Sequence, residues 1–123
     1  MDPTEPSEDQ LLAVHAALLE GCQADLARGG DPLAPDRVAL IALPHGMIEA
    51  QIAFGSRAEV ARELAYLAVD EGPAASGLPS IGAALRLREP AAEGRLLCVV
   101  VALGRARIHD IPWPRAAPPS FDA

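Results

Sequence analysis

The chain contains 123 residues, half of which are hydrophobic, and it carries a formal net charge of −7. A chain of this length can form one domain with a core of its own, and its apolar content excludes an intrinsically disordered protein. The sequence has no lysine, which excludes a P-loop and a side-chain Schiff base. We therefore expect a single domain over residues 1–123, with a disordered N-terminus at 1–6 and an extended, proline-rich tail at 112–123.

Compartment and cofactors are predicted from what the sequence lacks. Its amino-acid composition, which is rich in alanine and has arginine in place of lysine, is typical of a GC-rich bacterial genome. The longest apolar run, Leu96–Leu103, is too short to span a bilayer, and the acidic start of the chain lacks the basic region of a signal peptide. Cys22 and Cys98 fall in a predicted helix and a predicted buried strand, so we expect no disulfide framework. We expect a cytoplasmic protein with no membrane contact and no cofactor.

The first helix is predicted by a capping box at Ser7–Gln10, in which each side chain bonds a backbone N–H of the other residue. Leu11 and Leu18 belong to an apolar stripe with helical spacing, and Gly29 ends the helix. His15 lies on the apolar side of this helix. We expect it to be a packed histidine and not a ligand to a metal.

Two strands and a second helix follow. Residues 37–43 are continuously apolar, as in a strand covered on both faces, and residues 47–54 alternate between apolar and polar. The segment 44–46 contains Pro and Gly, so it predicts the turn of a β-hairpin. A second capping box at Ser56–Glu59 begins a helix that ends at Gly72.

The last third of the chain predicts strands again, after a loop at 73–80. Leucine alternates with arginine at 85–88, residues 96–103 have the β-branched density of a buried central strand, and residues 105–108 alternate once more. The predicted order is α-β-β-α-β-β, with a further strand at the end. The predicted class is α+β, with one mostly antiparallel sheet, a central strand at 96–103 and two amphipathic helices packed on the sheet.

This element order resembles that of the roadblock and profilin-like modules. The resemblance implies a five-stranded sheet held between helices. It concerns topology alone, and a shared topology does not imply a function.

Few residues are candidates for catalysis. His45 lies in the predicted hairpin turn, and His109 precedes Asp110, although neighbours on a strand face opposite ways. A proton-transfer site would combine His45 and His109 with an acid such as Glu49 or Asp110. Packing or turn roles are the better interpretation of these histidines, and none of them has the spacing of a metal site.

Four arginines are the candidate binding residues. Arg86 and Arg88 share one face of a predicted strand, and Arg105 and Arg107 share a face of another. Together they could bind carboxylate or phosphate groups. The alternative, which the sequence favours, is a solvated salt-bridge network, because like charges opposite one another destabilise a sheet. The acids available for such a network are Glu49, Glu89 and Glu93.

The tail carries Trp113 between two prolines. An extended segment with one large anchor can dock in a groove of another protein. The favoured alternative is that Trp113 folds back onto its own core, because a lone exposed tryptophan is a liability in a soluble protein.

Three classes of function remain open. The leading hypothesis is a non-catalytic protein–protein interaction or assembly module, including a homodimer, that uses a sheet edge, a helix face or the Trp113 tail. The second is a small enzyme or ligand-binding protein built on His45 and His109. The third is an acidic decoy that competes for a basic site on another protein. Nucleic acid is disfavoured as a partner, because a chain of net charge −7 repels phosphates and has only four aromatic side chains.

Overall fold

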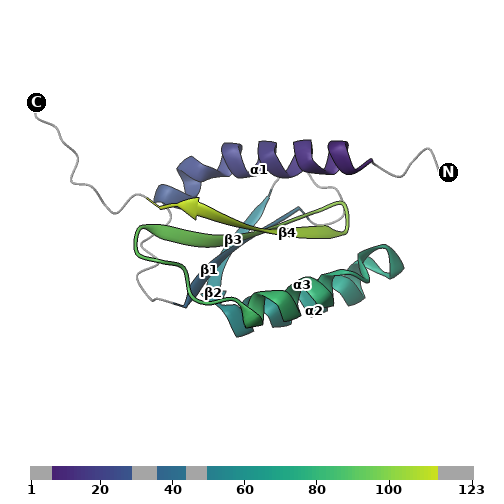
Figure 1. Ribbon diagram of the computed structural model, residues 1–123. Coiled ribbons are helices and arrows are strands. Elements are labelled where there is room, and N and C mark those ends of the chain that lie inside the picture. The colour runs from purple at the N-terminus through teal and green to yellow at the C-terminus, as the bar shows by residue number, and fades with distance from the viewer. Residues whose placement is uncertain (1–6, 29–35, 44–49, 114–123) are drawn as a thin grey trace, which may run out of the picture.

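The computed structural model describes residues 7–28, 36–43 and 50–113 of the chain. They form a four-stranded sheet with helices on both of its faces (Figure 1). The elements in chain order are α1 (Glu8–Arg28), β1 (Arg37–Leu43), β2 (Gln51–Ser56), α2 (Arg57–Glu71), the 3-10 turn η2 (Pro73–Ala75), α3 (Leu78–Leu87), β3 (Arg95–Ala102) and β4 (Arg105–Pro112). The predicted α+β class is confirmed. The expected disordered segment at 1–6, the turn at 44–46 and the tail beyond Trp113 lie outside the described residues.

The strands lie in the order β2-β1-β3-β4. β1 pairs with β2 and β3 with β4 in antiparallel fashion, whereas β1 and β3 are parallel at the centre. The prediction of a mostly antiparallel sheet with an interior strand near 96–103 is therefore confirmed. The central pair is parallel because α2, η2 and α3 carry the chain across the sheet, and parallel strands need such a crossover.

Both predicted capping boxes begin their helices. At α1 the backbone N–H of Ser7 donates to Gln10 Oε1 at 2.8 Å, and that of Gln10 donates to Ser7 Oγ at 3.2 Å. Ser56 and Glu59 make the same reciprocal pair at the start of α2, with distances of 2.9 and 3.1 Å. These bonds satisfy backbone donors that a helix start leaves without intrahelical partners.

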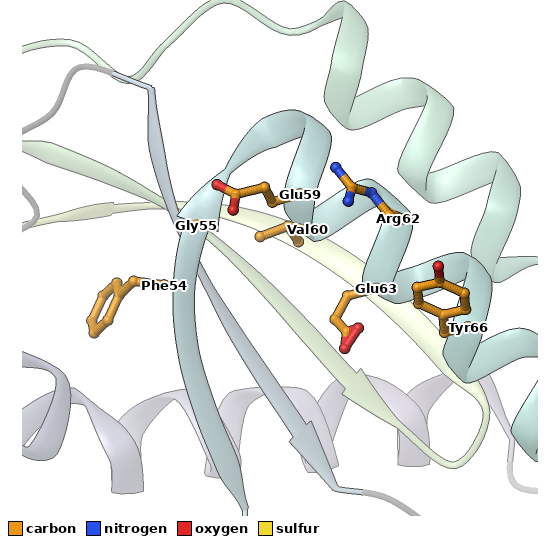
Figure 2. Close-up of a pocket in the computed structure, with 7 residues that line it drawn as sticks. All are labelled: Phe54, Gly55, Glu59, Val60, Arg62, Glu63 and Tyr66. Atoms are coloured by element: carbon orange, nitrogen blue, oxygen red, sulfur yellow. The ribbon is translucent and has the colours of Figure 1, made fainter.

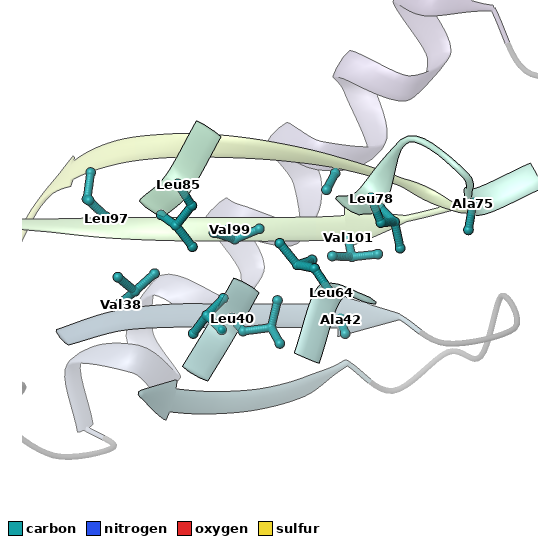
Figure 3. Close-up of a cluster of buried hydrophobic side chains, with 12 residues drawn as sticks. Val38, Leu40, Ala42, Leu64, Ala75, Leu78, Leu85, Leu97, Val99 and Val101 are labelled. Atoms are coloured by element: carbon teal, nitrogen blue, oxygen red, sulfur yellow. The ribbon is translucent and has the colours of Figure 1, made fainter. Parts of the chain in front are cut away.

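The sheet has one apolar cluster on each face. The cluster that faces α2 and α3 is drawn in Figure 3 and includes Leu40, Leu64, Leu85 and Val99. The cluster that faces α1 includes Ile41, Cys98 and Val100, with side chains of α1 packed against it. Burial on both faces explains why the sequences of β1 and β3 are continuously apolar.

The segment 85–88 is not a strand, which corrects the sequence prediction. Leu85 and Leu87 belong to α3, and Arg88 is the C-cap of that helix. The face of α3 that packs on the core carries Leu78, Gly82 and Leu85, which are spaced four and three residues apart, as one face of a helix requires. Leu87 is 87% exposed, so the leucine–arginine alternation does not reflect a buried strand face.

The five-stranded sheet that the resemblance implies is therefore not seen, because only four of the five predicted strands are strands in the described residues. The predicted loop at 73–80 also changes, since η2 and the first turn of α3 occupy most of it.

A two-residue turn joins β3 to β4 and fixes the position of the last strand. Ala102 pairs with Arg105, and Leu103 and Gly104 between them have φ values of 55° and 76°. Positive φ at both positions is the geometry of a type I′ turn, whose twist matches the twist of the strands. The turn returns β4 along β3 as the outermost strand. No helix in the described ranges is both long and apolar enough to cross a membrane.

Candidate binding groove on strand β4

The side chains of β4 alternate between the two faces of the sheet. Ala106 and Ile108 pack in the cluster that faces α2 and α3. Arg107 reaches Glu8 of α1, and the ring of His109 lies 6.3 Å from that of His15 of α1. Because side chains alternate along a strand, β4 presents an apolar side toward α3 and a basic side toward α1.

A pocket of about 610 Å³ runs along β4, and we call it the β4 groove. Its walls come from α1 and from the α3 region, and its floor comes from the outermost strand of the sheet. Its lining residues are Leu11, Leu12 and His15 of α1, Ile81 and Arg88 of the α3 region, and the β4 residues 105–109. The volume falls within the range of roughly 300–1,000 Å³ that ligand pockets occupy.

Three guanidinium groups line the groove, and one carboxylate contacts two of them. Arg107 donates a hydrogen bond to Glu8, and Nη1 of Arg105 lies 3.9 Å from Oε2 of the same residue. The third arginine, Arg88, lines the groove from the end of α3. The lining and this contacting acid therefore leave an excess of positive charge in a chain whose net charge is −7.

The acid that contacts two of these arginines was not predicted from the sequence. Glu8 lies 99 residues before Arg107 and comes from the first turn of α1. It was not among the acids proposed from the sequence, which were Glu49, Glu89 and Glu93.

His15 is the most deeply buried polar side chain of the groove. It is 1% exposed, which agrees with the packed position expected for it. Neither of its ring nitrogens has a hydrogen-bond partner of normal geometry in the described part of the chain, and the same holds for Nε2 of His109. The two rings meet edge to face, at an interplanar angle of 74°. Polar groups buried without partners cost free energy and need an explanation.

The pKa of both histidines is lowered by their surroundings. Burial lowers the pKa of His15, and the nearby charges of Arg107 and His109 lower it further, with a smaller opposing effect from a weak hydrogen bond to the backbone of Arg105. Burial also lowers the pKa of His109, again with a contribution from Arg107. A bound anion would oppose these effects, because a negative charge favours the protonated imidazole.

The remaining predicted site residues lie elsewhere. Arg86 is on α3 and does not line the groove, so the four arginines do not gather on one sheet surface. Asp110 accepts a hydrogen bond from Nε of Arg95 at 2.8 Å. His45 and Glu49 lie outside the described residues. The predicted proton-transfer site, which needs His45, therefore stays a prediction.

Trp113 packs on the cluster that faces α1, as the favoured interpretation of the tail predicted. Its ring meets that of Phe54 edge to face, with centroids 6.4 Å apart, and its backbone N–H donates to the carbonyl of Gly94 at 2.8 Å. These contacts hold Trp113 against the domain, away from the lining of the β4 groove.

A second pocket, of about 260 Å³, lies where β2 meets α2 (Figure 2). Glu59, Arg62, Glu63 and Tyr66 extend from α2, while Phe54 points away from them. The carboxylate of Glu59 already accepts the backbone N–H of Ser56 in the capping box. This pocket mixes acids with a single arginine, so it has no clear preference for one charge.

Neither a metal site nor a similarity to known proteins helps to define the function of the groove. Within residues 7–28, 36–43 and 50–113, no three His, Cys, Asp or Glu side chains are grouped so that they could hold a metal ion. Comparisons with protein-family models, curated proteins and solved structures gave no match. The function must therefore be argued from the geometry of the groove.

Proposed function

We propose that this protein is a non-catalytic interaction module that binds an acidic segment of a partner protein in the β4 groove. The observation that carries the proposal is the pairing of two features in one groove. Three guanidiniums line it, and so does the buried ring of His15, neither of whose nitrogens makes a hydrogen bond of normal geometry among the described residues. Carboxylates supply the negative charge and the hydrogen-bond acceptors that such a site needs.

Charge also favours a protein partner over nucleic acid. The acidic remainder of the chain repels an extended phosphate backbone, whereas a short acidic segment can contact the groove alone. Local positive charge would steer such a segment to the groove and make its binding sensitive to salt.

A catalytic role has less support. Asp110, the acid next to His109 in the sequence, is bonded to Arg95. The pKa of both histidines is lowered by burial, and the charge of Arg107 lowers it further. Among the hydrogen bonds and ion pairs of the described residues, no carboxylate orients either ring as in a typical general base.

The test uses the dye-labelled, end-capped peptide Glu-Val-Glu-Val-Glu-Val and measures its fluorescence anisotropy with the intact protein. Replacing Arg88 by glutamine should weaken binding by about two- to fivefold, because an exposed charge contact contributes up to about 1 kcal/mol. The matched control is Arg86→Gln, which removes the same charge from the same helix outside the groove.

Equal affinities for the Arg88→Gln and Arg86→Gln proteins would show that the peptide does not use the groove. A single-stranded oligonucleotide of equal charge should bind more weakly than the peptide. If it binds more tightly, the partner class is wrong.

A further inference from the structure

The outer edge of β4 is a strand edge that no described strand covers. β4 pairs with β3 along Arg105–Pro112 and is the last strand in the sheet order. In an antiparallel pair, alternate residues direct their backbone N–H and C=O groups toward the neighbouring strand, and the others direct theirs outward. The outward groups of β4 can therefore pair with one more strand.

The groove places that edge between two walls. Leu12 of α1 lines one wall and is 44% exposed, while Ile81 of α3 lines the other. The helices lie on opposite faces of the sheet (Figure 1), so an added strand would enter between them. The five groove residues of β4, 105–109, span about 14 Å at the rise of a strand, which suits a segment of about five residues.

The two sides of β4 specify the side chains of the added strand. On the α1 side, every second residue of the added strand would lie opposite Arg105, Arg107 and His109. Acidic residues suit these positions of the added strand. On the α3 side, Ala106 and Ile108 favour apolar residues. The pattern that fits is an alternation of acidic and apolar residues.

A second copy of this chain fits less well as the occupant. If two β4 strands paired about a twofold axis, basic side chains of one copy would stand opposite or beside those of the other on the α1 side. Like charges in such positions destabilise a sheet. The charge of the groove therefore points to another protein.

We infer that the partner segment joins the sheet as an antiparallel or parallel strand on the outer edge of β4, with alternating acidic and apolar residues. This inference rests on the proposed function and adds the mode of binding and the sequence pattern of the partner. Main-chain hydrogen bonds would supply affinity, and the alternating side chains would supply specificity.

The deciding experiment compares two N-methylated forms of the end-capped Glu-Val-Glu-Val-Glu-Val peptide. One form carries methyl groups on the glutamate nitrogens and the other on the valine nitrogens. In a strand, one of these two sets faces β4 and the other faces away. Strand addition predicts that one form loses about tenfold or more in affinity, because two or three hydrogen bonds are lost, while the other form keeps its affinity within about threefold.

Every outcome bears on the inference. Equal affinity of both methylated forms and the parent peptide would overturn strand addition and leave binding through charge intact. Equal loss in both forms would overturn strand addition as well, because a strand has two distinct edges. If the unmodified peptide does not bind, the proposed function itself fails.

A second measurement follows the backbone amides of β4, which are the protein's part of the same contact. Hydrogen exchange of the β4 amides, followed by NMR, should slow at alternate residues when the parent peptide is added. The peptide Glu-Glu-Glu-Val-Val-Val, with the same composition and charge, should not produce this alternating protection, because it cannot place acids on one side and apolar residues on the other. Alternating protection by both peptides would overturn the predicted sequence pattern.

Discussion

Glu8 occupies the position that an acidic partner would have to share, so its removal should tighten binding. Its carboxylate accepts a hydrogen bond from Arg107 and lies 3.9 Å from Arg105. The substitution Glu8→Gln keeps the size of the side chain and removes the charge. Both guanidiniums then become available to the partner, and the excess of positive charge in the groove increases by one.

The size of the effect follows from the exposure of the three side chains. Those of Glu8, Arg105 and Arg107 are 63%, 53% and 37% exposed, so solvent screens their attraction. Such pairs contribute roughly 0.2–1 kcal/mol each, and an acid in the first turn of a helix contributes roughly 0.3–1 kcal/mol. We expect Glu8→Gln to cost about 1 kcal/mol of folding free energy and to strengthen peptide binding by about two- to fivefold.

The assay is the anisotropy titration with the Glu-Val-Glu-Val-Glu-Val peptide at two salt concentrations, with thermal unfolding measured in parallel. Asp9→Asn is the matched control, because Asp9 is the other acid in the first turn of α1 and is not a partner of Arg105 or Arg107 among the ion pairs of the described residues. An unchanged or weaker affinity of the Glu8→Gln protein would refute the competition between Glu8 and the peptide. Equal strengthening by Asp9→Asn would show a general effect of net charge instead.

Two further predictions concern stability. Because the pKa of His15 is lowered from 6.5 by folding, the unfolded chain takes up a proton first as the pH falls, and stability is lost below about pH 6.5. The uptake of one proton corresponds to about 1.4 kcal/mol of unfolding free energy per pH unit. Denaturant unfolding should therefore show a smaller change in the free energy of unfolding between pH 7.5 and pH 5.5 for His15→Leu than for the wild type. An identical change in both proteins would contradict this prediction. Leu103 has a φ of 55° at the first position of the β3–β4 turn, where Asn is preferred before Gly. Leu103→Asn should therefore raise the free energy of unfolding by up to about 1 kcal/mol, and Leu103→Ala, which lacks the preference of Asn for this conformation, should not.

The sequence predicted the elements whose signals are local. The capping boxes at Ser7 and Ser56 marked both long helices, because each box depends on residues three positions apart. The apolar runs of β1 and β3 marked buried strands, because both faces of the sheet are covered. These features do not depend on which elements become neighbours in the fold.

Elements and contacts that depend on topology were missed. The helix α3 contains small residues, and its Leu85–Arg88 end happens to alternate, so a strand was predicted there. One turn earlier, Gly82 allows α3 to approach Ala61 of α2 closely. The groove was missed for a related reason. The alternation of Arg105 and Arg107 was visible in the sequence. The order of the strands and the placement of α1 and α3 on opposite faces of the sheet were not visible, and these determine which side chains lie next to β4.

Two interpretations of the β4 arginines can be separated by the position of His15. Charged residues on an edge strand protect a sheet against unwanted pairing, and exposed arginines alone would serve that purpose. Protection does not require a buried imidazole whose two nitrogens lack hydrogen bonds of normal geometry in the described part of the chain. Such a group costs roughly 1–3 kcal/mol of stability, which an apolar side chain at the same position would avoid. Departures of this kind from good packing are expected where a site is kept for binding. The combination of a basic edge and a buried histidine without hydrogen bonds of normal geometry therefore favours an edge that recruits a partner strand over one that only repels it.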